Sequence, residues 1–202
     1  MNYSSDVAFT QAVKAVQDRK GSRPHYTRME EAGSWETQIT PELKLFIEAQ
    51  SSVFLATANS ENQPYIQHRG GPPGFLRVLD EGTIGFVDFI GNRQYVTRGN
   101  LAENPKAHLF LIDYAQRKRV KIWGEASVIE SDPTLMRELM PSGYNARPSQ
   151  LILIAVRAWD ANCPQHIPQR FDAAEVTAVI AERDERIKAL ELQVAQLRRE
   201  RD

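Results

Sequence analysis

Two short segments of the chain combine arginine with glycine in a way that suits the binding of an anion. The first runs Gln67-His68-Arg69-Gly70-Gly71-Pro72-Pro73-Gly74-Phe75. Adjacent glycines let a ligand approach the backbone closely and leave amide groups free to donate hydrogen bonds. Arg69 could then hold a phosphate group through two parallel hydrogen bonds. A glycine–proline turn with a surface arginine accounts for the same residues, and this segment alone favours the turn.

Another glycine lies beside a basic group in the second segment, Asp88-Phe89-Ile90-Gly91-Asn92-Arg93-Gln94-Tyr95, and Thr97 and Asn100 follow it. Two strand ends that each carry glycine and arginine are what a doubly charged phosphate monoester requires. The alternative is again a turn, in which the arginine pairs with Asp88. Neither segment matches the P-loop or the Gly-x-Gly-x-x-Gly pattern, so the sequence disfavours nucleoside triphosphates and Rossmann dinucleotides.

Both segments fall at the ends of predicted strands. Short apolar runs rich in strand-forming residues alternate with turns such as Asp80-Glu81-Gly82 along the middle of the chain. The predicted strands span residues 52–58, 63–69, 75–79, 83–89, 107–113, 120–129 and 151–158. Six or seven short strands with few helices between them favour an antiparallel barrel or sandwich. A doubly wound parallel fold would need a helix after nearly every strand.

Helices are expected around these strands. Residues 6–19 have roughly helical apolar spacing that ends at Gly21, whereas residues 22–38 are polar and irregular and predict a surface loop. Thr40 as an N-cap and Pro41 at the first helical position predict a short helix that begins there. Two further short helices are expected, at 100–104 before Pro105 and from the capping Asp132 to Met140.

The last part of the chain, residues 173–202, contains no glycine or proline and has a heptad pattern. Its apolar positions alternate steps of three and four, with one position filled by Arg183, and comprise Val176, Ile180, Ile187, Leu190, Val194 and Leu197. A narrow stripe between charged flanks predicts a coiled coil. We favour pairing between subunits, and folding back onto the chain's own β domain is the alternative. The predicted organisation is an N-terminal helix and loop (1–39), a β domain (40–170) and a coiled-coil helix (173–202).

The composition is that of an ordinary globular protein. The 202 residues carry a formal net charge of −1, which gives no reason to expect nucleic acid as a partner. One cysteine, Cys163, allows neither an intramolecular disulfide nor a cysteine-rich zinc site, and His25, His68 and His108 are scattered, so no metal is predicted. No apolar run approaches the roughly 18 residues of a membrane span. The start lacks a signal-peptide pattern, so we expect a cytoplasmic protein without membrane association.

Taken together, these segments resemble the pyridoxamine 5′-phosphate oxidase-related, FMN-binding split-barrel family. The resemblance covers roughly residues 40–165 and depends on the order and spacing of four motifs. The motifs are Gln67 to Phe75, Asp88 to Arg93, Thr97 to Leu101 with Asn104-Pro105, and Arg119-Val120-Lys121-Ile122-Trp123-Gly124. By this resemblance the chain is mainly β with flanking helices, a six-stranded antiparallel split β-barrel. The family further implies a homodimer with FMN at the subunit interface and an oxidoreductase activity.

The resemblance also implies which residues bind the cofactor. Arg69 and its glycines would line the phosphate or the flavin edge, and the second segment would contact the phosphate and the ribityl chain. Arg119 would approach the ring or the phosphate, and Lys121 is a weaker candidate. Strand alternation puts both on the same face as Trp123, and an exposed basic ladder is the alternative for them. The implied cofactor-binding residues are Gln67, His68, Arg69, Gly70, Gly71, Gly91, Asn92, Arg93, Thr97, Arg119 and Lys121.

The chain departs from true pyridoxamine phosphate oxidases after the barrel. Those enzymes carry an Arg-His-Asp-type substrate signature there, whereas this chain has Cys163-Pro164-Gln165-His166-Ile167-Pro168-Gln169-Arg170. Oxidation of vitamin B6 is therefore disfavoured, and the substrate and electron donor stay unassigned. A thiolate–imidazole pair of Cys163 and His166 is one hypothesis for this segment. We favour a loop that covers a cavity mouth, because the prolines prevent a helix that would align the two side chains.

No catalytic residue is assigned, because a bound flavin would carry out the hydride or electron transfer while the protein supplies position and electrostatics. The substrate, a small molecule, would stack over the exposed flavin face between subunits, where Trp159 or Tyr95 could line the pocket. The alternative function is a non-catalytic split barrel that holds flavin or haem, with the coiled coil docking a partner. A third hypothesis is a dimeric scaffold without flavin.

Overall fold

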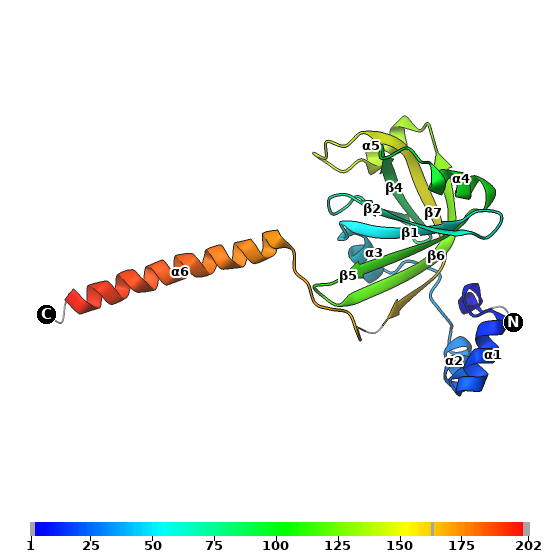
Figure 1. Cartoon of the computed structure of the whole chain (residues 1–202), viewed down its shortest axis with the longest axis horizontal. Coiled ribbons are helices and arrows are strands. Elements are labelled where there is room, and N and C mark those ends of the chain that lie inside the picture. The colour runs from blue at the N-terminus through cyan, green and yellow to red at the C-terminus, as the bar shows by residue number, and fades with distance from the viewer. Residues whose placement is uncertain (1–2, 163, 200–202) are drawn as a thin grey trace. The chain divides into compact units, whose positions relative to one another are not determined.

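Seven antiparallel strands form a single sheet in the order β2-β1-β5-β6-β7-β4-β3 and curve around a common interior (Figure 1). This computed structural model describes residues 3–162 and 164–199. The strands are β1 (Ser52–Ala58), β2 (Pro64–Gly70), β3 (Arg77–Asp80), β4 (Thr83–Phe89), β5 (Lys106–Asp113), β6 (Lys118–Ile129) and β7 (Pro148–Asn162). The predicted antiparallel, mainly β fold is confirmed.

The sheet differs from the expected six-stranded barrel in strand number and in closure. Seven strands are present among the described residues, because the four-residue β3 pairs with β4 across the turn at Glu81 and Gly82. The order of the sheet ends at β2 on one side and at β3 on the other, and no backbone pairing of described residues joins them. The barrel is therefore not closed by hydrogen bonds.

Alternation along the strands builds the core. β1 and the first half of β6 bury every second residue, and Leu55, Leu109 and Ile122 are fully buried in neighbouring strands. Period-two alternation of this kind places one face of each strand against the interior. The same register leaves Arg119, Lys121 and Trp123 together on the opposite face of β6, as predicted.

Three short helices accompany the strands at the predicted places. They are α3 (Pro41–Glu48), α4 (Val96–Glu103) and α5 (Pro133–Leu139). The Thr40 hydroxyl accepts a hydrogen bond from the Leu43 amide, and the Asp132 carboxylate accepts from the first turn of α5, so both predicted N-caps are confirmed. α4 begins four residues earlier than the prediction from Asn100, at Val96.

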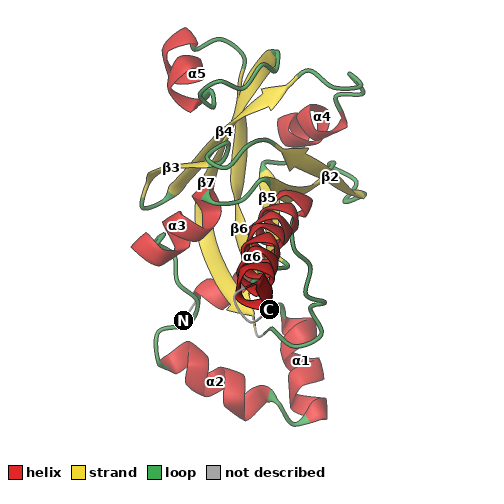
Figure 2. Ribbon diagram, turned by 90° about the vertical axis from the view of Figure 1, so that its left-hand side faces the viewer, coloured by secondary structure: helices red, strands yellow, loops and turns green. Residues whose placement is uncertain are grey.

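The N-terminal segment contains more helix than its composition indicates. A short 3₁₀ helix, η1 (Ser4–Val7), precedes α1 (Gln11–Lys20), which ends at Gly21 with φ 78° as predicted. The loop predicted for residues 22–38 is wrong, because α2 (Arg23–Glu31) occupies much of it. α1 and α2 pack against each other (Figure 2). The helix was not evident because the side chain that it buries most completely is charged, Glu30, rather than apolar.

A buried carboxylate holds these N-terminal elements together. Glu30 is only 2% exposed and pairs with Arg23, with Lys14 at 3.4 Å and with the Ser5 hydroxyl at 3.1 Å. Burial by itself would raise the pKa of Glu30, but the hydrogen bonds from Arg23 and Ser5 hold that pKa below its ordinary value. One ionised side chain therefore links η1, α1 and α2.

Aromatic contacts join this helical segment to the sheet. Trp35 stacks on Trp123 of β6 with ring centroids 4.7 Å apart and an interplanar angle of 15°. Glu36 forms an isolated bridge with Trp159 of β7, and the Trp159 indole N–H donates to the Gln38 carbonyl at 2.8 Å. Residues 35–38, which follow α2, therefore pack against β6 and β7 at these two tryptophans.

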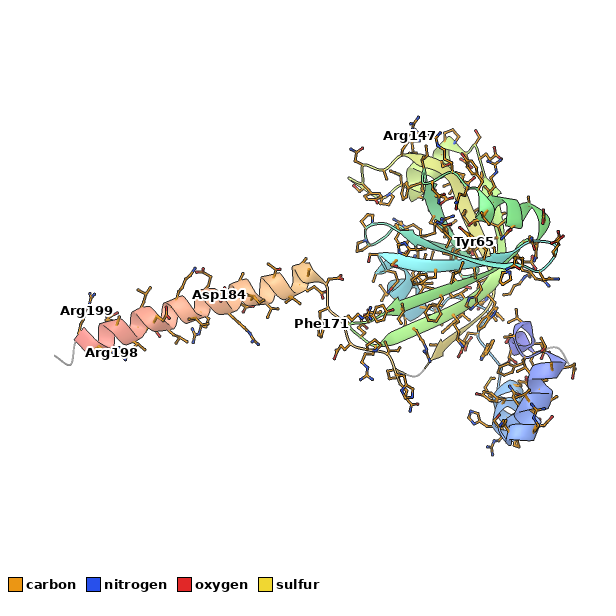
Figure 3. All side chains as sticks on the ribbon, viewed as in Figure 1. Tyr65, Arg147, Phe171, Asp184, Arg198 and Arg199 are labelled. Atoms are coloured by element: carbon orange, nitrogen blue, oxygen red, sulfur yellow. The ribbon has the colours of Figure 1, made fainter. Side chains whose placement is uncertain are left out.

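The chain divides into two compact units, Met1–Asp113 with Lys118–Pro164, and Tyr114–Arg117 with Gln165–Asp202. The second unit contains α6 (Ala173–Arg199), the predicted C-terminal helix, and none of the residues of α6 is buried. Figure 3 shows side chains along its whole length, Asp184 and Arg198 among them. None of the helices that the structure describes is long and apolar enough to cross a membrane.

Replacing Glu30 by glutamine is expected to lower the free energy of unfolding by about 2 kcal/mol at neutral pH, measured by urea denaturation. Loss of the charge leaves Arg23 without its counter-ion, whereas Lys14 keeps Asp6 at 2.5 Å, and partial exposure of both cations keeps the cost below the roughly 3–5 kcal/mol of a fully buried pair. The exposed neighbour Glu31→Gln is the control and should change stability little.

The same substitution predicts a pH dependence. A pKa held below the ordinary 4.5 means that the ionised Glu30 stabilises the fold above that pH and loses its contribution as the pH falls through the lowered value. The difference between wild type and Glu30→Gln should therefore shrink in acid. A difference that grows on acidification would contradict the assignment.

Candidate functional site

A cavity of about 250 Å³ opens where the ends of four segments meet. The segments are β2, the end of β4 with the loop after it, the start of α4, and the start of β7. The lining residues are Gln67, Arg69, Asp88, Phe89, Ile90, Gly91, Asn92, Arg93, Gln94, Tyr95, Val96, Thr97, Arg98, Ser149 and Gln150. The two arginine–glycine segments that the sequence singled out therefore meet in one place.

Arg69 crosses the gap between the two sides of the open sheet. Its Nε lies 3.0 Å from the Oδ1 atom of Asp88 on β4, and its Nη2 donates to the Thr97 hydroxyl at 3.3 Å. The Arg69 side chain is 17% exposed, and its buried Nε makes no hydrogen bond with any described residue, so the contact with Asp88 is ionic. The guanidinium is fixed in place while part of its donor capacity stays unused.

Asp88 is held by the strand beside it. In the β4–β7 register Asp88 lies opposite Gln150, whose side-chain amide donates to Oδ2 of Asp88 at 2.9 Å. Both side chains are buried. The pairing of Arg93 with Asp88, considered as an alternative from the sequence, is wrong, because Asp88 pairs with Arg69. Gln150 was missed, although a polar residue directly ahead of the apolar run 151–156 is a signal for it.

The loop after β4 adopts an unusual backbone. Arg93 and Tyr95 have φ values of 58° and 55°, a left-handed conformation that is costly for residues other than glycine. Asn92 supports the loop, since its side-chain oxygen accepts from the Gln94 amide and its nitrogen donates to the Gln94 side chain, both at 3.2 Å. Arg93 is exposed and pairs with no carboxylate among the described residues. The loop thus presents a free cation at the cavity.

The first turn of α4 contributes backbone amides to the same cavity. Tyr95, the N-cap residue, gives this helix no side-chain cap. The helix is anchored further along, because the Asn100 side chain donates to the Thr57 hydroxyl of β1 at 3.0 Å and both groups are buried. An uncapped helix N-terminus offers unpaired N–H donors and the positive end of the helix dipole, which together favour an anion.

The structure brings together only part of the predicted cofactor-binding set. The predicted residues that line the cavity are Gln67, Arg69, Gly91, Asn92, Arg93 and Thr97. Those that do not are His68, Gly70, Gly71, Arg119 and Lys121. His68 is exposed and its ring Nε2 lies 2.8 Å from the Ser52 hydroxyl. Tyr95, which the sequence suggested as a pocket residue, lines the cavity, whereas Trp159 does not.

Lys121 and Arg119 lie near the start of β6, away from the cavity. Lys121 is opposite Asp160 of β7, with Nζ 3.0 Å from its carboxylate, and the ammonium also lies over the rings of Trp123 and Trp35. Gln150 of the cavity belongs to the same strand as Asp160, and their separation of ten positions along it spans roughly 30 Å. Within one chain, Lys121 therefore does not reach the cavity.

His108 is half-buried and meets the edge of Trp123 with centroids 4.9 Å apart. Burial, together with the nearby charge of Lys121, lowers the pKa of His108. Cys163 lies outside the described residues, so the thiolate–imidazole hypothesis is not addressed, and His166 is exposed. Among the residues that the structure describes, no group of three or more histidine, cysteine or acidic side chains could hold a metal ion.

Two glycines of the motifs have different physical roles, and their alanine variants should separate them. A Cβ on Gly71 would lie 2.7 Å from the Cβ of the buried Phe75, so Gly71→Ala should lower the free energy of unfolding by about 1–3 kcal/mol. A Cβ on Gly91 would meet nothing within 4 Å, so Gly91→Ala should change it by no more than about 0.5 kcal/mol. Equal effects in urea denaturation would contradict this assignment.

Comparisons with known proteins show the family and the fold of this chain. A family model described as pyridoxamine 5′-phosphate oxidase matches residues 39–163, a range that contains every cavity residue. The HupZ protein of Group A Streptococcus is 19% identical, with 66% of this chain and 99% of that chain covered at a TM-score of 0.51. An FMN-binding protein from Syntrophomonas wolfei is 12% identical, with 72% and 97% covered at a TM-score of 0.49. No curated protein matches the chain. The chain belongs to the pyridoxamine 5′-phosphate oxidase family.

Proposed function

We propose that the cavity holds the phosphate of FMN and that the protein works as a homodimeric FMN-dependent oxidoreductase on a small-molecule substrate. The observation that carries the proposal is the Arg69 guanidinium, which Asp88 and Thr97 hold while some of its donors stay unused, in the same cavity as Arg93 and the uncapped start of α4. Membership of the family makes a flavin phosphate the natural anion for this site.

The charges in the cavity suit a phosphate monoester. Asp88 offsets the charge of Arg69, so the net positive charge comes from Arg93 and from the backbone amides of the α4 N-terminus. Arg69 still supplies directed donors, because Asp88 and Thr97 use only part of its guanidinium. A dianion would therefore meet two arginines and a helix N-terminus, the donor set that recurs in phosphate sites.

The size of the cavity limits how much of the nucleotide one chain can enclose. Its volume of about 250 Å³ lies below the roughly 300–1,000 Å³ of pockets that bury a drug-sized ligand. The phosphate and part of the ribityl chain would fill it, and the ring would lie at the mouth near Tyr95, whose side chain is 55% exposed. Bound flavin would supply the electron transfer, and the residues described above would orient it and fix its charge.

A second copy of the chain would cover the ring. On the outer face of the sheet, Ile66, Ala56, His108 and Trp123 lie opposite one another in a row across β2, β1, β5 and β6. Trp35 covers the Trp123 end of this row, and the Ile66 end is uncovered. Ile66 is 62% exposed, as expected for a face that awaits a partner. Lys121 shares this face, so a homodimer formed through it could bring Lys121 and Arg119 of one copy toward the flavin of the other.

Removing Arg93 should weaken the binding of FMN and leave the binding of riboflavin unaffected. A hydrogen bond to a charged group contributes about 1.5–3 kcal/mol, so Arg93→Ala should raise the Kd for FMN by about 10- to 100-fold. Riboflavin lacks the phosphate, and its Kd should not change. Quenching of flavin fluorescence on titration measures both constants. Arg157→Ala, an exposed arginine outside the cavity, is the control.

The paired variant Arg69→Ala with Arg93→Ala should abolish FMN retention while circular dichroism still shows the folded barrel. Loss of riboflavin binding to the same extent as FMN binding would place the arginines elsewhere than at the phosphate. Unchanged FMN retention in the paired variant would overturn the assignment of this cavity.

Reduction of the bound flavin tests the oxidoreductase activity separately from binding. Addition of a nicotinamide donor to the FMN-loaded protein should bleach the visible flavin absorbance without oxygen, and readmitted oxygen or another acceptor should restore it. A protein that retains FMN but is reduced by neither NADH nor NADPH would favour the non-catalytic flavin-binding alternative.

A further inference from the structure

α6 presents a stripe of large apolar side chains that the structure leaves exposed. None of its residues is buried, and Leu190, for example, is 43% exposed. The helix has 27 residues and extends about 40 Å. Exposing an apolar stripe of that length to water is costly, so the stripe needs a partner. We propose that α6 binds α6 of a second copy as a parallel, in-register, two-stranded coiled coil.

The heptad assignment carries the first part of this proposal. Steps of three and four place Ile180, Ile187 and Val194 at the a positions and Val176, Arg183, Leu190 and Leu197 at the d positions. β-Branched residues at a with leucine at d favour two parallel strands, because these shapes fit the two kinds of layer in a parallel dimer. Every a position within the stripe is β-branched, and two of the four d positions are leucine.

Charge complementarity sets the orientation. Arg186 occupies a g position and Glu191 the following e position. In a parallel, in-register pair, a g residue meets the e residue five places further along the other helix, so Arg186 of each copy faces Glu191 of the other. The dimer therefore gains two symmetric pairs of opposite charge.

Reversing one helix brings like charges together instead. The antiparallel alignment that sets Arg183 opposite Ile187 also sets Arg186 near Arg186 and Asp184 near Asp184. The alignment shifted by one heptad sets Asp184 near Glu191. Because e and g residues determine the choice of partner orientation in coiled coils, both alternatives are disfavoured.

Arg183 explains why the pair would stay in register and two-stranded. A single polar residue in the apolar seam specifies register at a cost in stability. In the parallel dimer a d side chain inserts next to the e residue of the facing helix, so Arg183 of each copy can reach Asp184 of the other. A shift by one heptad would set the two arginines into separate apolar layers, where one copy's Arg183 lies beside Glu191 and the other copy's Arg183 lies beside Thr177, which has no carboxylate.

Two leucines two residues apart allow a matched cross-linking test on the full chain. Leu190 lies at d, whereas Leu192 lies at f on the outer side of the helix and is 72% exposed. In a Cys163→Ser background, Leu190→Cys in a glutathione redox buffer should give at least about tenfold more disulfide-linked dimer than Leu192→Cys, because a disulfide forms only between neighbouring Cβ atoms. Non-reducing electrophoresis measures the fractions.

The outcomes separate the possible arrangements. In either antiparallel alignment Leu190 faces Ile180 or Ile187, so absence of the Leu190→Cys dimer would overturn the proposal. Equal cross-linking of the two cysteine variants would also overturn it, since random encounters would then explain both. Because the cavity is not involved, FMN retention should be the same in both cysteine variants. If the protein proved not to bind FMN, the expected cross-linking result would still hold.

Charge reversal gives a second, independent readout. In the Leu190→Cys background, Glu191→Arg should reduce the disulfide-linked fraction, because Arg186 of the other copy then meets a like charge. Adding Arg186→Glu should restore the fraction by recreating an opposite pair. No rescue by the second substitution would contradict the parallel contact.

Discussion

The ion pair between Arg69 and Asp88 is the constraint on which the open side of the barrel, and with it the cavity, depends. β2 and β4 lie near opposite ends of the strand order, and no backbone pairing of the described residues joins them. A side-chain contact of 3.0 Å bridges the gap instead. A charged pair largely removed from water is costly unless neighbouring groups satisfy its other donors and acceptors. Thr97 and Gln150 meet that requirement, which is why polar residues interrupt the apolar pattern at this point.

The same gap makes the fold suitable for a ligand. A barrel closed by hydrogen bonds would leave no opening at this edge, whereas a barrel bridged by one ion pair leaves a cavity lined with polar groups. The strained loop at Arg93 and Tyr95 lies at that opening, and the uncapped α4 begins there. Strained backbone and unsatisfied donors persist where the surrounding structure holds them, commonly at binding sites. The open side of the barrel and the cavity thus have the same cause: no backbone pairing within the described residues joins β2 to β3.

Much of the fold follows from local patterns. Short apolar runs rich in strand-forming residues, separated by turns, located the strands. Thr40, Asp132 and Gly21 marked helix ends, because caps and positive φ values are local properties. α2 was not predicted, since its buried residue, Glu30, is stabilised by Arg23, Lys14 and Ser5 rather than by apolar contact. The six-stranded expectation was wrong because a resemblance, rather than the residues, supplied the strand number. The heptad pattern located α6, since its period of apolar residues is complete within one segment.

For the site, the sequence by itself determined the residue types: two arginine–glycine segments at strand ends, sufficient to predict an anion site. Only the tertiary structure decided which of those residues meet. Arg69 and Arg93 line one cavity, whereas Lys121 and Arg119 lie toward the far end of β6, although all four have the same kind of charge. Gly71 packs against Phe75, and Gly91 faces open space. The physical reason is that pairings such as Arg69 with Asp88 and Asp88 with Gln150 depend on how the sheet curves, which no local pattern encodes.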